Sequence, residues 1–234
     1  MRMYLWGTPN SAIPLRDSSF DADIVCHEYT HGLSNRLTGG PANAACLNTL
    51  ESNGMGEGWS DFIAIAVNMN GTETRATNRV VAAWAAGTPA GIRKVPYSTS
   101  LRVNPLMYTN VNNETVTHNI GTVWNSMLYE VMWNLIDKHG LSAARKPAFP
   151  SGSVVPNDGR FLSMKLVIDA MALQPCNPSF ADARNAIVDA DSVLTGGENR
   201  CEIWKGFAKR GLGFGVVDGR VTRVNDFSVP PACV

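Results

Sequence analysis

The stretch that decides the fold is Asp23-Ile-Val-Cys-His27-Glu-Tyr-Thr-His31, which continues to Leu37 and then meets a Gly-Gly-Pro break at residues 39–41. This pattern predicts a helix from Asp21 to about Leu37, with Asp17 or Ser18 near its cap. Two histidines four positions apart lie on one face of a helix, one turn apart. Their imidazole nitrogens can therefore bind one metal ion at distances of about 2.0–2.1 Å.

Glu28 follows the first histidine and completes an HExxH pattern. A zinc ion lowers the pKa of a water molecule that it binds, and a neighbouring carboxylate can then accept the proton. Hydrolysis of an amide bond needs this division of labour between a Lewis acid and a general base. The same pattern also occurs by accident on solvated helix faces rich in His and Glu, so other residues have to support the hypothesis.

Glu57 and Asp61 provide that support within a second predicted helix, which runs from residue 54 to about 68. A catalytic zinc ion needs a third protein ligand and an open fourth position. Because the two carboxylates are four positions apart, both face the same way. Glu57 can bind the metal while Asp61 accepts the second ring N–H of a ligand histidine and fixes its tautomer. The alternative is that both are exposed helix carboxylates.

His118 comes directly before the longest periodic segment, residues 119–138. An imidazole at this place can donate a hydrogen bond to the oxyanion that develops on an attacked carbonyl. Glu114 is a candidate to orient it, and the alternative is a histidine at the start of a helix with no catalytic role. His139 is expected at a helix C-terminus, where a cation is favoured, so we interpret it as structural.

Beyond residue 20 the pattern predicts a mainly α chain without internal repeats. Further helices are expected over residues 75–86, 159–173, 179–194 and 199–210, and an irregular tail follows Gly211. No composition change marks a domain boundary. We therefore expect one domain over residues 1–234, in which the helices of 21–69 carry the site and residues 118–211 form a helical lobe.

Composition excludes several classes of protein. Apolar residues make up 44% of the chain, charged residues 17%, and the net charge is zero. These values are ordinary for a globular protein and give no electrostatic case for nucleic-acid binding. No apolar run reaches about 18 residues, so no membrane span is expected. We expect no nucleic-acid or membrane partner.

The five cysteines show no CxxC spacing, which disfavours a structural zinc site. An odd number leaves at least one thiol free, and we expect this to be Cys26, buried on the first helix. Cys176 and Cys201 flank a predicted helical hairpin and can pair. Two glycosylation sequons, at Asn70 and Asn113, fit a secreted protein.

Several blocks of the sequence resemble the fungalysin family, the secreted fungal extracellular metalloproteinases related to thermolysin. The resemblance rests on DIVCHEYTHGLSNRLTGG at residues 23–40, GMGEGWSDF at 54–62 and IGTVW at 120–124, with DARNAI at 182–187 and CEIW at 201–204. It extends over nearly the whole chain, and the first two blocks are highly specific.

The resemblance implies a thermolysin-like catalytic fold with an active-site helix and a helical C-terminal lobe. It implies that His27, His31 and Glu57 bind one zinc ion, with Glu28 as the general base, Asp61 supporting a ligand histidine and His118 stabilising the transition state. It further implies a secreted protein, made with a propeptide in a longer precursor, that cleaves protein or peptide substrates internally. We also expect a monomer. Calcium binding stays open.

One departure from the family is the short N-terminal part. Only 26 residues precede His27, whereas family catalytic domains have a long β-rich portion there that forms one wall of the cleft. We therefore expect this portion to be largely missing and the chain to be part of a longer protein. If the wall is absent, apolar surface is left exposed.

Three hypotheses about function follow. The first is a zinc metalloendopeptidase, and the second is a catalytically impaired zinc-binding fragment or remnant of one. The third is an exopeptidase with the same metal site. Exopeptidases of that kind usually need an additional loop that binds the free amine of the substrate, and the sequence shows no Gly-Ala-Met-Glu-Asn-like loop.

Overall fold

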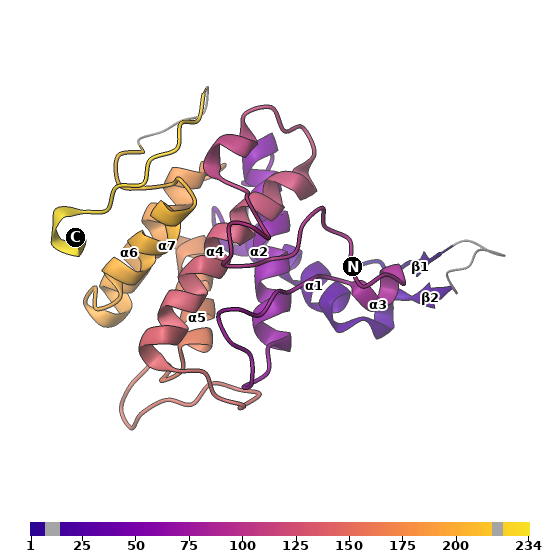
Figure 1. The fold of residues 1–234 in the computed structure, drawn as a ribbon, viewed down its shortest axis with the longest axis horizontal. Helices are drawn as coiled ribbons and strands as arrows, with labels where there is room; N and C mark the ends of the chain where they lie inside the picture. Colours follow the sequence, from indigo (N-terminus) through magenta and orange to yellow (C-terminus); the bar gives the residue numbers. More distant parts are fainter. Residues whose placement is uncertain (8–14, 217–221) are drawn as a thin grey trace.

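A computed structural model describes residues 1–7, 15–216 and 222–234 of the chain. In that part the chain is mainly helical, as the sequence predicts, with one small antiparallel sheet (Figure 1). The α-helices are α1 (Ala22–Leu37), α2 (Leu50–Asn68), α3 (Ala83–Ala86), α4 (Thr117–His139), α5 (Gly159–Leu173), α6 (Phe180–Thr195) and α7 (Arg200–Lys209). The strands are β1 (Leu5–Trp6) and β2 (Arg16–Asp17), and the 3-10 turns are η1 (Ser18–Phe20), η2 (Tyr108–Val111) and η3 (Pro231–Cys233). None of the described helices is long and apolar enough to cross a membrane.

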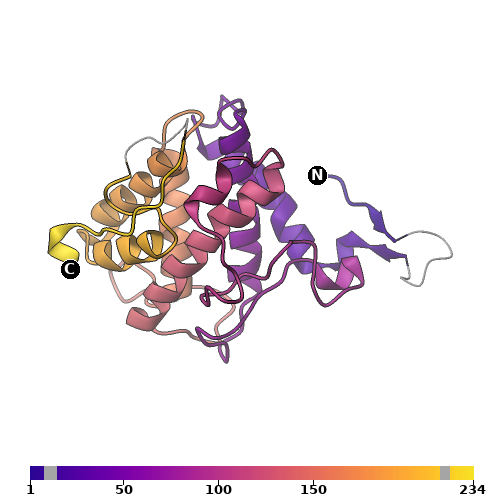
Figure 2. The same ribbon diagram turned by 45° about the horizontal axis from the view of Figure 1, so that its top comes forward.

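Helices α2 and α4 form the centre of the molecule. Figure 1 shows α5, α6 and α7 on one side of this pair, and α1 with the small sheet on the other. In Figure 2 the β1–β2 hairpin extends away from the helical body, at the opposite end from the C-terminus. The aromatic side chains of Trp59, Phe180 and Phe207 surround the buried Trp124 of α4.

Glycines let α2 and α4 approach each other to backbone contact. A Cβ atom on Gly58 would lie 2.6 Å from the carbonyl oxygen of Gly121, and one on Gly121 would lie 2.7 Å from the amide nitrogen of Gly58. Any side chain at either position would therefore push the helices apart. This close contact fixes the first turn of α4, which carries His118, against the middle of α2, which carries Glu57.

The start of α1 differs from the expectation. Asp21 caps the helix, since its Oδ1 accepts a hydrogen bond of 3.0 Å from the amide of Asp23. Asp17 caps the preceding 3-10 turn instead, through the amide of Ser19. The capping prediction was wrong because η1 separates β2 from α1. Helix α2 begins four residues earlier than expected, at Leu50, where Thr49 and Ser52 form a capping box.

The helix expected over residues 75–86 is wrong except for its last turn, α3. Arg79 and Tyr97 exchange backbone hydrogen bonds of 2.9 and 2.8 Å, which draws this segment toward the loop that follows. Ala82 then has a positive φ of 57° and starts α3. Long-range pairing has therefore replaced a local helical preference.

Arg210, at the end of α7, binds the loop between α3 and α4. Its guanidinium donates to the carbonyl oxygens of Ser98 and Asn104 at 2.5 Å each, and it pairs with the buried Glu130 at 2.8 Å. Because these groups are buried, their loss would leave several polar groups without partners. The loop is thus fixed where it approaches α2.

Two disulfides join distant parts of the chain, and the pairing of Cys176 with Cys201 was wrong. Cys46 pairs with Cys176, with Cα atoms 4.4 Å apart, and Cys201 pairs with Cys233, at 5.1 Å. The first bond links the α1–α2 loop to the α5–α6 loop, and the second links the C-terminal turn to α7. Both pairings follow from tertiary packing and are not visible in sequence spacing. Cys26 is free, as expected, although half-buried rather than buried.

Candidate metal centre

Helices α1 and α2 bring three potential metal ligands together. Nε2 of His27 lies 3.1 Å from Nε2 of His31 and 3.2 Å from Oε2 of Glu57. The third distance, from Nε2 of His31 to Oε1 of Glu57, is 3.7 Å. The ligand atoms all lie within 4.8 Å of one another. The structure therefore brings together the three residues in which the sequence predicted a metal site.

These distances fit a tetrahedral metal ion. Ligand bonds of about 2.0–2.1 Å at a tetrahedral angle place neighbouring ligand atoms about 3.3 Å apart. The buried Oε2 of Glu57 makes no hydrogen bond of good geometry among the described residues, although it faces Nε2 of His27 at 3.2 Å and Nε2 of His118 at 3.3 Å. A divalent cation between them would satisfy this carboxylate oxygen and the lone pairs of both facing imidazoles. The residues present thus suit a divalent metal.

Asp61 binds His27 through the ring nitrogen that does not face the other two candidate ligands. The carboxylate is fully buried, and its Oδ1 lies 2.8 Å from Nδ1 of His27. With Nδ1 as the donor, the lone pair of His27 is on Nε2, which faces the other two ligands. Burial opposes ionisation of Asp61, but the bonds from His27 and Arg93 outweigh it and hold the pKa of this carboxyl well below its usual range.

The charges of this cluster attract a cation. Burial lowers the pKa of His27, but Asp61 and Glu57 outweigh burial and raise it to about 9. Burial, with the charge on His27, lowers the pKa of His31. In the absence of a metal, His27 therefore carries a proton on both ring nitrogens near neutral pH, and a metal ion has to displace the proton on Nε2.

Sequence reasoning missed Arg93 and Tyr97, which complete the surroundings of Asp61. Arg93 binds the carboxylate through Nε, at 2.6 Å from Oδ2, and through Nη2, at 2.8 Å from Oδ1. The hydroxyl of Tyr97 donates to Oδ2 at 2.5 Å. Both residues come from the irregular loop between α3 and α4, where no spacing rule applies. No sequence signal could have placed them at the site.

His118 lies at the open edge of the cluster. Its Nε2 is 3.3 Å from Oε2 of Glu57, and its side chain is 55% exposed. Glu114 does not reach this imidazole among its described contacts: its carboxylate accepts hydrogen bonds of 3.0 Å from the amides of Thr115 and Val116. The structure thus gives Glu114 a role at the start of α4. His139 lies in the last turn of α4, 2.6 Å from Oδ1 of Asn199, which fits its structural interpretation.

Glu28 is half-buried on α1 and faces a cavity of about 660 Å³ that His31 also lines. The same cavity is bordered by Tyr29 and Met1. A molecule bound in this cavity would contact both a carboxylate and a candidate metal ligand.

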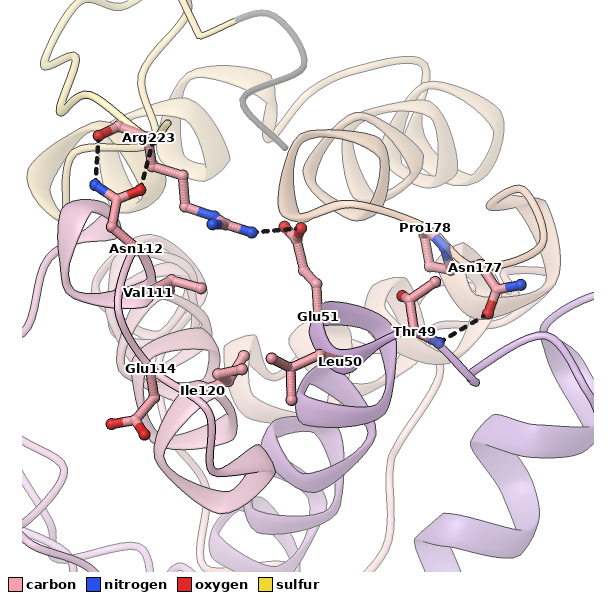
Figure 3. Close-up of a pocket in the computed structure, with 10 residues that line it drawn as sticks. All are labelled: Thr49, Leu50, Glu51, Val111, Asn112, Glu114, Ile120, Asn177, Pro178 and Arg223. Carbon is pink, nitrogen blue, oxygen red and sulfur yellow. Dashed lines mark hydrogen bonds and ion pairs between the residues drawn. The ribbon is translucent and has the colours of Figure 1, made fainter. Parts of the chain in front are cut away.

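A second cavity, of about 300 Å³, lies at the N-terminal ends of α2 and α4 (Figure 3). Arg223 reaches across it to Glu51, with Nη2 2.6 Å from Oε2, and Asn112 binds the backbone of Arg223. The other carboxylate oxygen of Glu51 accepts the amide of Phe180 at 2.9 Å. These contacts join α2, α6 and the C-terminal segment, so Glu51 and Arg223 are engaged with each other.

Comparison with known proteins identifies the family. Residues 1–216 match the fungalysin metallopeptidase (M36) family. The chain belongs to this family. The resemblance seen in the sequence blocks is thereby confirmed, and a fungalysin is expected to bind a metal.

Several fungalysin relatives share about 60% of their residues with this chain. The extracellular metalloproteinase MEP of Neosartorya fischeri is 61% identical over 230 residues, which is 98% of the chain and 36% of the relative. The extracellular metalloproteinase mep of Aspergillus fumigatus is 60% identical over 98% of the chain and 36% of the relative. The extracellular metalloproteinase 9 of Coccidioides posadasii is 60% identical over 233 residues, or 100% of the chain and 36% of the relative. The chain thus spans about a third of the length of these curated relatives.

Proposed function

We propose that this chain carries the catalytic centre of a zinc-dependent metalloendopeptidase. The observation that carries the proposal is the convergence of His27, His31 and Glu57 within 4.8 Å, with His27 held from behind by Asp61. Two imidazoles and one carboxylate are the ligand set of catalytic zinc sites that keep a fourth position open. Imidazole ligands in a tetrahedral arrangement favour zinc over calcium or magnesium, which prefer oxygen ligands.

Glu28 is the proposed general base. Zinc, when bound, supplies Lewis-acid activation of water and of the substrate carbonyl. Glu28 accepts the proton of the attacking water and can pass it on to the leaving amine. Its position beside His31 in an accessible cavity supports this role.

His118 is the proposed donor to the oxyanion. The side chain is exposed and next to Glu57, so a carbonyl presented to the metal centre lies within its reach. A donor at this place strengthens its hydrogen bond as negative charge develops on the carbonyl oxygen.

The relatives are named extracellular metalloproteinases, and this supports a secreted protein that acts on protein or peptide substrates. We propose that the active form is a monomer released from a longer precursor with a propeptide.

A paired measurement tests the proposal. The purified chain and Glu28→Gln are each titrated with zinc and assayed on a quenched protein substrate. Glu28→Gln is expected to bind zinc as tightly as the wild type and to lose hydrolysis, while the exposed Glu198→Gln keeps both. If Glu28→Gln still hydrolyses the substrate, Glu28 is not the base.

A second candidate is a zinc-binding segment that does not hydrolyse peptides by itself. It is favoured by large apolar side chains that are exposed: Phe20 just before α1 at 78%, Tyr29 in the middle of α1 at 72%, and Leu5 of β1 at 65%. Exposed apolar groups of this size commonly contact another part of a protein. Zinc binding without hydrolysis by the wild-type chain would select this candidate.

A further inference from the structure

The carboxylate of Asp61 has no free acceptor position. A carboxylate offers about four lone-pair positions, two on each oxygen. Oδ1 takes His27 Nδ1 and Arg93 Nη2, both at 2.8 Å. Oδ2 takes Arg93 Nε at 2.6 Å and the Tyr97 hydroxyl at 2.5 Å. Any rotation of the carboxylate therefore breaks several short bonds in a fully buried site.

Among these partners, Tyr97 differs in one respect. Two of these partners also lie near Glu57: Nε2 of His27, the ring nitrogen that does not bind Asp61, is 3.2 Å from the Glu57 carboxylate, and Nη2 of Arg93 is 3.9 Å from it. The Tyr97 hydroxyl bonds to Asp61 and also interacts with the neutral side chain of Asn125, and no second carboxylate contacts it among the described residues. Tyr97 is thus the partner of Asp61 that makes no described contact with a candidate metal ligand.

The backbone that carries Tyr97 is itself fixed. Tyr97 is fully buried and exchanges backbone hydrogen bonds of 2.9 and 2.8 Å with Arg79. The next residue, Ser98, gives its carbonyl oxygen to the buried Arg210 at 2.5 Å. The phenol therefore reaches Asp61 from a support that cannot easily move, which is what a positioning contact needs.

We propose that Tyr97 is a positioning residue of the metal centre: its hydroxyl holds Asp61, which in turn holds His27 in the orientation and tautomer that bind the metal. The inference rests on the proposed metal site but assigns a role to a residue that never touches the ion. Its consequence is that a single hydroxyl, one contact beyond Asp61, contributes to metal affinity.

The test compares two isosteric substitutions. Tyr97→Phe removes the hydroxyl on Asp61, whereas Tyr129→Phe removes an equally buried hydroxyl that donates to the carbonyl oxygen of Thr77 at 2.9 Å. Zinc affinity is measured at 25 °C by competition with a chromophoric chelator, and the absorption spectrum of the cobalt-loaded protein reports the geometry of the ligands. We expect zinc affinity about 3- to 10-fold weaker for Tyr97→Phe, somewhat less than the loss typical of a group that contacts a ligand directly. The cobalt spectrum should shift as well, and Tyr129→Phe should match the wild type in both measurements.

The outcomes separate this inference from the proposed function. A wild-type chain that fails to bind zinc removes the metal site and, with it, the role of Tyr97. A wild type that binds, together with a Tyr97→Phe variant within twofold of it or tighter, overturns the positioning role alone. If Tyr97→Phe does not fold, the hydroxyl proton of Tyr97 can be followed by NMR in the wild type: a resonance that shifts on zinc titration supports the coupling, and an unmoved one refutes it.

Discussion

Replacing Asp61 by asparagine removes the negative charge that binds Nδ1 of His27 while keeping the size of the side chain. The structure predicts two separate losses. Both oxygens of the Asp61 carboxylate accept hydrogen bonds, four in all, from His27, Arg93 and Tyr97. Asparagine replaces one of these oxygens by an NH₂ group, which donates. The donors that bind that oxygen in the wild type therefore lose their acceptor. The guanidinium of Arg93, whose side chain is 7% exposed, also loses its main counter-charge.

The magnitudes follow from these contacts. Loss of a group that orients a ligand histidine lowers metal affinity by about 10- to 100-fold, or about 1.4–2.7 kcal/mol. Removing one partner of a buried ion pair costs about 3–5 kcal/mol of folding free energy, measured without metal. The free energy of unfolding of a globular domain is about 5–15 kcal/mol, so the variant should stay folded at 25 °C.

The assay has two parts and one control. Urea unfolding of the metal-free chain measures the loss in free energy of unfolding. Competition for zinc, under conditions where the variant is folded, measures the loss in zinc affinity. Asp137→Asn serves as the matched control, because that carboxylate pairs with Arg75 and its side chain is 55% exposed. Its folding loss should stay below about 1 kcal/mol and its zinc affinity should not change. An Asp61→Asn chain that binds zinc within threefold of the wild type would refute the reasoning that Asp61 prepares His27 for the metal.

Further predictions concern the other members of the site. Glu57→Ala should weaken zinc binding at least tenfold while Glu202→Ala on α7 does not, as measured by the same competition; equal affinities would remove Glu57 from the site. His118→Ala should lower kcat about 10²- to 10³-fold with zinc affinity unchanged, and an unaltered kcat would exclude an oxyanion role. Because the pKa of His27 is raised to about 9, zinc binding at pH 7 should release about one proton, which calorimetry in buffers of different ionisation enthalpy can count; no proton release would contradict the charge state inferred for His27. The raised pKa of His27 also stabilises the metal-free fold, by about 3 kcal/mol at most; this contribution is fully present below pH 6.5 and is lost as the pH rises through about 9. Urea unfolding at pH 6 and pH 9.5 tests it, and equal free energies of unfolding at the two pH values would contradict it.

The sequence predicted those features that depend on local periodicity. The spacing of His27 and His31 and that of Glu57 and Asp61 required helices, and α1 and α2 are present in those places. The bounds of α5 were predicted as Gly159–Leu173 and are observed there. Residues four positions apart share one face of a helix whatever else the helix buries, so these spacings are informative even in α2, which buries residues all around its circumference.

Features that depend on pairing between distant segments were not predictable. The helix expected over residues 75–86 gave way to the pairing of Arg79 with Tyr97, and the disulfide of Cys176 was assigned to the wrong partner. Arg93 reaches Asp61 from a loop 32 residues further along the chain. A sequence pattern does not encode such contacts, since the loop is held by groups such as Arg210, which is 112 residues away from Ser98 along the chain.

The measurement that tests the central claim most directly is hydrolysis of a quenched protein substrate by the purified chain with one equivalent of zinc, with and without a chelator. The geometry of His27, His31 and Glu57 beside Glu28 predicts cleavage that the chelator abolishes and that added zinc restores. Tight zinc binding without any cleavage would contradict the claim that this chain carries a working peptidase centre.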